Sequence, residues 1–276
     1  MWKVLGASVT GNSHVASGTG CQDASGWRTH AGVTCLAVAD GAGSRPLSAT
    51  GSALAVEQAL ETVARLASDE NSPGDLANWL RTAFDSARDR VVAFASSTER
   101  KPAEYASTLA VAILTADHIA IGQLGDGITV VGSGSRYVAV HPEVKGEYVN
   151  ETFFLTASDW YEHLRLTVLA GAADVVALST DGLRYKITNT KTSAPFGPFF
   201  DGLLSYVQGT EASSDGISRF LAGLENDQTG DDKSLVAAVQ VTVEADVTHD
   251  GGETWPAYAV ADITGQPPAL PVTAPG

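Results

Sequence analysis

Aspartates border apolar, strand-like runs at four separate places in the chain. They are Asp40, Asp126, Asp181 and the pair Asp231-Asp232. A strand fixes its last Cα within a sheet, so each carboxylate is aimed by the scaffold rather than by a mobile loop. Converging carboxylates repel one another unless a cation lies between them, and hard divalent cations prefer oxygen ligands. The pattern therefore predicts a divalent-metal site at one end of a sheet core.

Three of these acids are followed by glycine, as in Asp40-Gly41. A single Asp-Gly pair predicts no more than a plain turn, because the dipeptide is among the commonest in turns. The metal site is favoured instead because the same order, an apolar strand followed by Asp-Gly, is repeated along the chain. Gly41 also allows a backbone carbonyl to approach whatever Asp40 binds.

The elements that must position these acids are predicted from apolar spacing and turn residues. Strands are expected at 3–9, 33–39, 107–115, 118–124, 128–132, 136–140, 174–179 and 234–243. Helices are expected at 48–68, from Pro73 to beyond Phe94, near Trp160, and once or twice between 195 and 223. The residues around His14 are expected to form a loop, and the four strands from 107 to 140 an antiparallel meander. The predicted fold class is α+β, with sheets packed on each other and helices outside.

The composition limits the class of protein. The 276 residues are 44% hydrophobic, enough for one substantial domain, placed at residues 1–247. Residues 248–276 contain five prolines and are predicted to form an extended tail. The formal net charge of −15 argues against nucleic-acid and anionic-membrane partners. With no membrane-length apolar run and two cysteines without metal or redox spacing, we expect a cytoplasmic protein with free thiols.

Five short motifs, in this order, resemble those of the metal-dependent (PPM, type 2C) serine/threonine protein phosphatases, in particular their bacterial branch. They are Gln22-Asp23-Ala24, 38–43 (VADGAG), Gly125-Asp126-Gly127, 179–183 (STDGL) and 231–234 (DDKS). The similarity extends from about residue 6 to residue 243. It implies a central sandwich of two antiparallel β-sheets flanked by helix pairs. It also implies two magnesium or manganese ions at one end of the sandwich, with a third ion possible.

The resemblance assigns the catalytic metal ligands to three aspartates. Asp40 would bridge both ions, while Asp181 and Asp231 would hold the first. The carbonyl of Gly41 would bind the second ion. The last motif aligns ambiguously by one residue, so Asp232 is the alternative to Asp231.

Two further acids have implied roles. Asp23 would lie near the first ion and act through water, and Asp126 would help to hold a weaker third ion. The implied reaction is hydrolysis of phosphoserine or phosphothreonine by a metal-bridged hydroxide that attacks phosphorus in line. The implied partners are a phosphoprotein substrate and a cognate serine/threonine kinase, and a monomer is the default state.

The sequence departs from the family where many members grip the substrate phosphate with an arginine. Gly18 occupies that position here. Some bacterial relatives carry Gly-x-Ser-His upstream, which Gly11 to His14 fits. Our hypothesis is that His14, with Arg45, contacts the phosphate; the alternative is a loop histidine bonded to its neighbours. Arg184, where an acid is frequent, either alters substrate access or is a solvated charge.

Two other classes of protein remain as alternatives. One is a pseudophosphatase, a module that binds phosphoproteins or kinases without turnover, which the missing arginine favours mildly. Retention of the mutually repelling acids argues against it, because a non-catalytic member has no chemical need of them. The other is an unrelated β-rich binding domain whose Asp-Gly turns are structural. Five motifs in the family's order are difficult to produce from turns alone.

Overall fold

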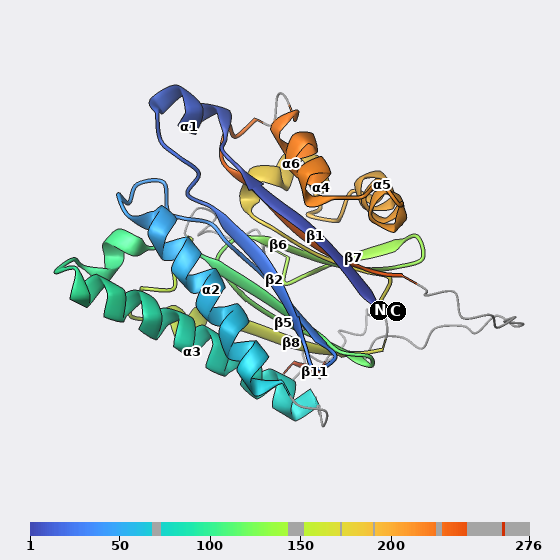
Figure 1. The fold of residues 1–276 in the computed structure, drawn as a ribbon, viewed down its shortest axis with the longest axis horizontal. Helices are drawn as coiled ribbons and strands as arrows, with labels where there is room; N and C mark the ends of the chain where they lie inside the picture. Colours follow the sequence, from blue (N-terminus) through green and yellow to red (C-terminus); the bar gives the residue numbers. More distant parts are fainter. Residues whose placement is uncertain are drawn as a thin grey trace, which may run out of the picture.

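The computed structural model describes residues 1–67, 73–142, 152–171, 173–189, 191–224, 228–241 and 261–262. Two antiparallel sheets pack face to face, and helices cover the outer face of each (Figure 1). The predicted α+β sandwich flanked by helices is confirmed.

One sheet has five strands. Their order is β1 (Trp2–Val9), β10 (Lys233–Gln240), β9 (Val175–Ser179), β6 (Ile128–Ser133) and β7 (Arg136–Val140). Its outer face packs against α4 (Arg184–Ile187), α5 (Gly197–Gln208) and α6 (Ser214–Ala222). In Figure 1 these three helices lie together above the sheets. One or two helices were predicted between 195 and 223, and the structure has two there, α5 and α6.

The other sheet has six strands. Their order is β11 (Ala261–Asp262), β8 (Arg165–Ala170), β5 (His118–Leu124), β4 (Leu109–Leu114), β3 (Val33–Ala39) and β2 (Ala24–His30). Its outer face is covered by α2 (Ser48–Leu66) and α3 (Pro73–Ser97). These helices pair with each other, as predicted, and run side by side in Figure 1. Three short 3₁₀ helices complete the elements: η1 (Pro102–Tyr105), η2 (Trp160–His163) and η3 (Asp181–Leu183).

The interior of the sandwich explains the strand sequences. Every residue of β3 and β4 is buried, because one face of their sheet meets the other sheet and the opposite face meets α2 and α3. Strands buried on both faces read as continuous apolar runs rather than alternating ones. Leu36, Val38, Val176 and Val236 meet in the layer between the sheets. This layer fixes the strand ends that carry the acids.

The predicted meander is wrong in one respect. β4 pairs with β5 and β6 pairs with β7, but β5 and β6 belong to different sheets. The turn Gly125–Gly127 carries the chain from one sheet to the other. Since β5 and β6 are both buried on two faces, apolar content did not reveal which sheet each of them joins.

Among the described elements, seven were not predicted: α1, α4, β2, β8, β11, η1 and η3. β2 was missed because four of its seven residues are exposed, and β8 lay in a stretch of mixed character. The predicted loop around His14 contains a short helix, α1 (Asn12–Ser17). The helix predicted near Trp160 is present as η2.

The division of the chain at residue 247 stays a prediction. Of residues 248–276, the structure describes only β11, which pairs antiparallel with Thr167 and Val168 of β8. Within the described parts of the chain, the helices are too short or too polar to span a lipid bilayer.

Candidate metal centre

Sheet topology brings the acidic strand ends together. β3 and β5 both pair antiparallel with β4, so their carboxyl ends lie at the same edge of one sheet. In the other sheet β9 and β10 are antiparallel, so the end of β9 lies beside the beginning of β10. One carboxylate oxygen each of Asp40, Asp126 and Asp181 lies within 4.8 Å of the other two. The acids predicted to converge from these three positions do so.

The electrostatics of this group favour a bound cation. Burial, followed by the charges of Asp23 and Asp181, raises the pKa of Asp40 well above its ordinary value. Burial and the charges of Asp126 and Asp231 raise the pKa of Asp181 to about 6, although its hydrogen bond with Asp40 opposes this. Three close, partly buried carboxylates are oxygen ligands of the kind that Mg²⁺ and Mn²⁺ prefer. The donor set therefore fits a hard divalent cation.

The backbone around Asp40 is held rigidly. Its N–H donates to Thr108 Oγ1 at 2.9 Å, and its carbonyl accepts the N–H of Thr108 at 2.8 Å. Next to it, a Cβ on Gly41 would lie 2.5 Å from the carbonyl oxygen of Gln22. A side chain at position 41 would therefore displace the segment that leads into Asp23.

Asp23 lies behind the three-acid group and is held by a hydroxyl. Thr180 Oγ1 donates to Asp23 Oδ2 at 2.7 Å and accepts the N–H of Ser234 at 3.0 Å. Burial raises the pKa of Asp23 to about 8; the hydrogen bond from Thr180 lowers it, and the charge of Asp232 raises it. When ionised, Asp23 in turn raises the pKa of Asp40, so the two acids oppose each other's charge.

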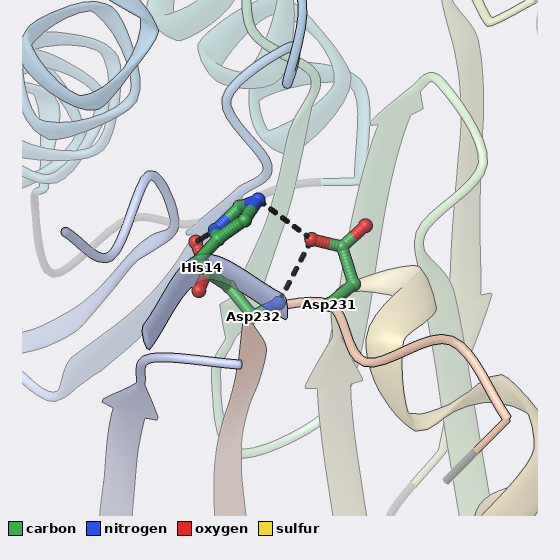
Figure 2. A group of neighbouring side chains, drawn as sticks. All are labelled: His14, Asp231 and Asp232. Atoms are coloured by element: carbon green, nitrogen blue, oxygen red, sulfur yellow. Dashed lines mark hydrogen bonds and ion pairs between the residues drawn. The ribbon is translucent and has the colours of Figure 1, made fainter. Parts of the chain in front are cut away.

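The second group of acids comes from the beginning of β10 (Figure 2). Asp232 is buried, and its two oxygens accept the backbone N–H groups of Gly11 and Gln22 at 2.8 and 2.6 Å. His14 Nδ1 lies 2.9 Å from Asp232 Oδ2. The side chain of Asp231 is 45% exposed, and its Oδ1 lies 3.6 Å from His14 Nε2. The two neighbours thus occupy different environments. The charge of Asp231 adds to burial and to the charges of other acids in raising the pKa values of Asp40 and Asp181.

Comparison with known proteins now decides the family. The model of the family "Protein phosphatase 2C" matches residues 10–222. The chain belongs to this family. Serine/threonine-protein phosphatase 3 of Escherichia coli (strain K12) is 31% identical over 252 residues, which take in 86% of this chain and 98% of that protein. These values agree with the resemblance found in the motifs.

Solved structures show the same fold. The serine/threonine phosphatase of S. agalactiae has a TM-score of 0.64 at 12% identity and covers 87% of this chain and 99% of its own. Stp1, a serine/threonine phosphatase from Staphylococcus aureus, has a TM-score of 0.62 at 15% identity and covers 88% of this chain and 96% of its own. At these identities the likeness concerns the sandwich and its helices.

In this phosphatase 2C domain, the two residues predicted to contact phosphate occupy different surroundings. Both ring nitrogens of His14 face carboxylates, those of Asp231 and Asp232. Arg45 is exposed just before α2, where its carbonyl accepts the hydroxyl of Ser48 at 3.0 Å. His14 Nδ1 is buried and has no hydrogen-bond partner among the described residues, so its proximity to the two carboxylates does not make it a hydrogen-bonded loop histidine. Phosphate contact stays a prediction for both residues.

Sequence reasoning missed the residues that hold the acids of this phosphatase 2C domain in place. Thr108 and Thr180 fix Asp40 and Asp23 through their hydroxyls. Thr180 directly precedes Asp181, so a hydroxyl residue next to a candidate ligand was an available signal. Thr108 lies 68 residues from Asp40 in sequence, and only the fold brings them together.

Proposed function

We propose that this protein hydrolyses phosphoserine and phosphothreonine in proteins, using divalent ions held at the acidic end of the sandwich. The convergence of Asp40, Asp126 and Asp181 within 4.8 Å is the observation that supports this most directly. Membership of the protein phosphatase 2C family supports the reaction class.

In this proposal Asp40, Asp181, Asp231 and the carbonyl of Gly41 hold two ions, manganese or magnesium, and Asp126 helps to hold a third. When bound, such ions supply Lewis-acid charge and an activated water at neutral pH. The chain's own part is to place the carboxylates before the ions arrive. No protein nucleophile is needed.

The remaining acids support this arrangement. Asp23, fixed by Thr180, acts on the site through its charge and through water. Asp232 fixes the loop residues Gly11 and Gln22, which supports Asp231 over Asp232 as the ligand, because both oxygens of Asp232 are already engaged.

The first test compares hydrolysis of an aryl phosphate and of a phosphothreonine peptide with manganese and with a chelator. Asp40→Asn and Asp181→Asn are measured beside the parent protein. We expect manganese-dependent turnover that falls by about 10²–10³-fold or more in both variants, the scale seen when charge stabilisation of a transition state is removed. A parent that binds manganese but turns over neither substrate would instead identify a pseudophosphatase.

The phosphate-contact hypothesis has its own test. His14→Ala and Arg45→Ala are assayed with aryl phosphate at saturating manganese. A contact to the phosphate predicts a raised Michaelis constant, and an unchanged constant in a folded variant removes the residue from this role.

We further propose that the protein acts in the cytoplasm of a bacterium, as a monomer, against a cognate serine/threonine kinase. The bacterial relatives and the acidic charge support this setting. Phosphoproteomics of a deletion strain tests it: accumulation of phosphothreonine or phosphoserine on cytoplasmic proteins is expected, and an unchanged phosphoproteome contradicts it.

A further inference from the structure

The turn Gly125–Gly127 carries Asp126 at the point where the chain passes from the six-stranded to the five-stranded sheet. A turn that leaves one sheet for another has no neighbouring strand to fix its backbone. Asp126 is nevertheless held within 4.8 Å of two other acids that repel it. Something other than sheet pairing must keep it there.

Side chains bond all three carbonyls of this turn. Arg165 Nη2 donates to the carbonyl of Gly125 at 3.1 Å, and Arg184 Nη2 donates to the carbonyl of Asp126 at 2.9 Å. Gln123 Nε2 donates to the carbonyl of Gly127 at 2.6 Å. Two guanidinium groups and one side-chain amide thus hold the three backbone carbonyls of the turn.

The two arginines come from opposite layers of the sandwich. Arg165 begins β8 of the six-stranded sheet and also donates from Nη1 to the carbonyl of His141 at 2.9 Å. Arg184 begins α4, directly after β9 of the five-stranded sheet and η3. A guanidinium group is planar and directs its donors rigidly, so each arginine holds the turn relative to its own layer.

The opposite side of the turn is also fixed. Gly125 has φ +96°, and a Cβ there would lie 2.5 Å from the side chain of Thr108, the residue that holds Asp40. Asp126 Oδ2 accepts the hydroxyl of Thr152 at 3.0 Å. Asp126 therefore has one backbone position and one carboxylate direction.

The charge of Arg184 adds to its geometry. Arg184 is half-buried, and its charge opposes the rise in the pKa of Asp181 that burial and the neighbouring acids cause, so it offsets part of the repulsion within the three-acid group. A purely solvated charge, one of the two interpretations of Arg184 from sequence, does not describe this placement, and the other, altered substrate access, stays a prediction.

We propose that Arg165 and Arg184 are positioning residues that hold Asp126 against Asp40 and Asp181, so that the carboxylates are in place before a cation binds. The inference rests on the proposed function and adds to it two residues that touch neither substrate nor ion. Its consequence is measurable: the arginines set the affinity for divalent metal more than the affinity for phosphoester.

The experiment titrates metal-free, full-length protein with Mn²⁺ and measures free Mn²⁺ by electron paramagnetic resonance. The variants are Arg184→Lys and Arg165→Lys, which keep the charge and lose the planar donor pair. Arg90→Lys, on the exposed face of α3, is the matched control. We expect about tenfold weaker Mn²⁺ binding in both Arg184→Lys and Arg165→Lys, because loss of a partner that orients a ligand typically costs about 10–100-fold in metal affinity.

Two further readouts separate positioning from a general loss of stability. Turnover of aryl phosphate should return toward the parent value at high Mn²⁺, with a Michaelis constant within about twofold, since the substrate contacts are unchanged. The double variant should lose less than the product of the single losses, because both arginines hold one turn. If Arg184→Lys does not fold, Arg165→Lys still tests the proposal, because Arg165 bonds the carbonyl of Gly125, the residue before Asp126.

Specific outcomes would overturn the inference. Unchanged Mn²⁺ binding in the folded variants does so, and a raised Michaelis constant with unchanged Mn²⁺ binding would make Arg184 a substrate contact. Asp126→Asn serves as the reference for loss of the acid itself. A parent that binds no Mn²⁺ would contradict the proposed function as well. A parent that binds Mn²⁺ no more tightly than the two arginine variants would contradict only the positioning role of the arginines.

Discussion

Two groups of acids lie at the same end of the sandwich and differ in how their charge is balanced. Asp40, Asp126 and Asp181 face one another, and burial and mutual repulsion raise the pKa values of Asp40 and Asp181. Asp232, in the second group, instead accepts two backbone N–H groups and lies beside His14. The first group is compensated only in part, by Arg184 and Thr152, whereas Asp232 in the second has a donor for each oxygen.

The difference teaches how to distinguish a metal ligand from a structural carboxylate. A buried carboxylate that already has hydrogen-bond donors is stable without a cation. Carboxylates that face each other are stable only when protonated or when a cation binds. Asp231 lies at the boundary of the two groups, since it contacts His14 and its charge acts on Asp40 and Asp181.

The largest effect is expected from Asp231→Asn, which tests to which group this residue belongs. If it is a metal ligand, manganese-dependent turnover of aryl phosphate falls by about 10²–10³-fold, comparable with loss of other charge-stabilising groups. The melting temperature of the metal-free protein should change little, because the side chain is 45% exposed. Full turnover in Asp231→Asn, with Asp232→Asn inactive and folded, would reverse the assignment.

A smaller effect, on stability rather than on chemistry, is expected from Asp232→Ala. Two buried backbone donors lose their acceptor, so the free energy of unfolding should fall by roughly 2–4 kcal/mol. Urea denaturation of the metal-free protein measures it. Asp232→Asn keeps one acceptor oxygen and should lose less. A change below about 1 kcal/mol in Asp232→Ala would mean that the two groups are not different in kind.

The smallest expected effect is the pH dependence of the metal-free protein. The folded-state pKa values of Asp23 and Asp181 are raised to about 8 and about 6, so the folded chain retains protons that the unfolded chain releases. The contribution of Asp23 and Asp181 to the free energy of unfolding is therefore greatest below the ordinary carboxyl pKa of about 4. It is lost as pH rises through about 6 and about 8.

Melting temperatures measured across this range, with and without Mn²⁺, check this sign. Mn²⁺ should raise the melting temperature most at the alkaline end, where the carboxylates are ionised. Asp40→Asn removes one of the repelling charges and should flatten the metal-free curve. A melting temperature that rises steadily from acid to about pH 8 would show that groups of the protein also balance the negative charge of Asp40, Asp126 and Asp181.

Much of the fold was readable from the sequence because apolar content and turns mark strands well. The ends of β3, β5 and β9 were placed by the Asp-Gly pairs that follow them, and the core helices α2 and α3 by their apolar spacing. The sheet to which each strand belongs was not readable, since β5 and β6 are both buried on two faces. β2 was missed because its exposed edge position leaves few apolar residues.

The site was predictable to the level of its acids and no further. Asp40, Asp126 and Asp181 were found because each ends an apolar, strand-like run and precedes a glycine, and this order repeats. The partners that hold them were not, because Thr108 and Arg165 are ordinary residues until the fold places them against Asp40 and Gly125. Arg184 carried a signal, as a cation where an acid is frequent, but its partner could only be seen in the folded chain.

The acidic strand ends belong to different layers, with Asp40 and Asp126 following strands of one sheet and Asp181 following a strand of the other. A cation bound in the proposed site would thus be a non-covalent cross-link between the sheets, at one end of the sandwich only. Its binding free energy would add to the work of separating the layers there. Amide hydrogen exchange in the last residues of β3 and β9 should consequently slow as metal binds, so it measures metal occupancy without any substrate.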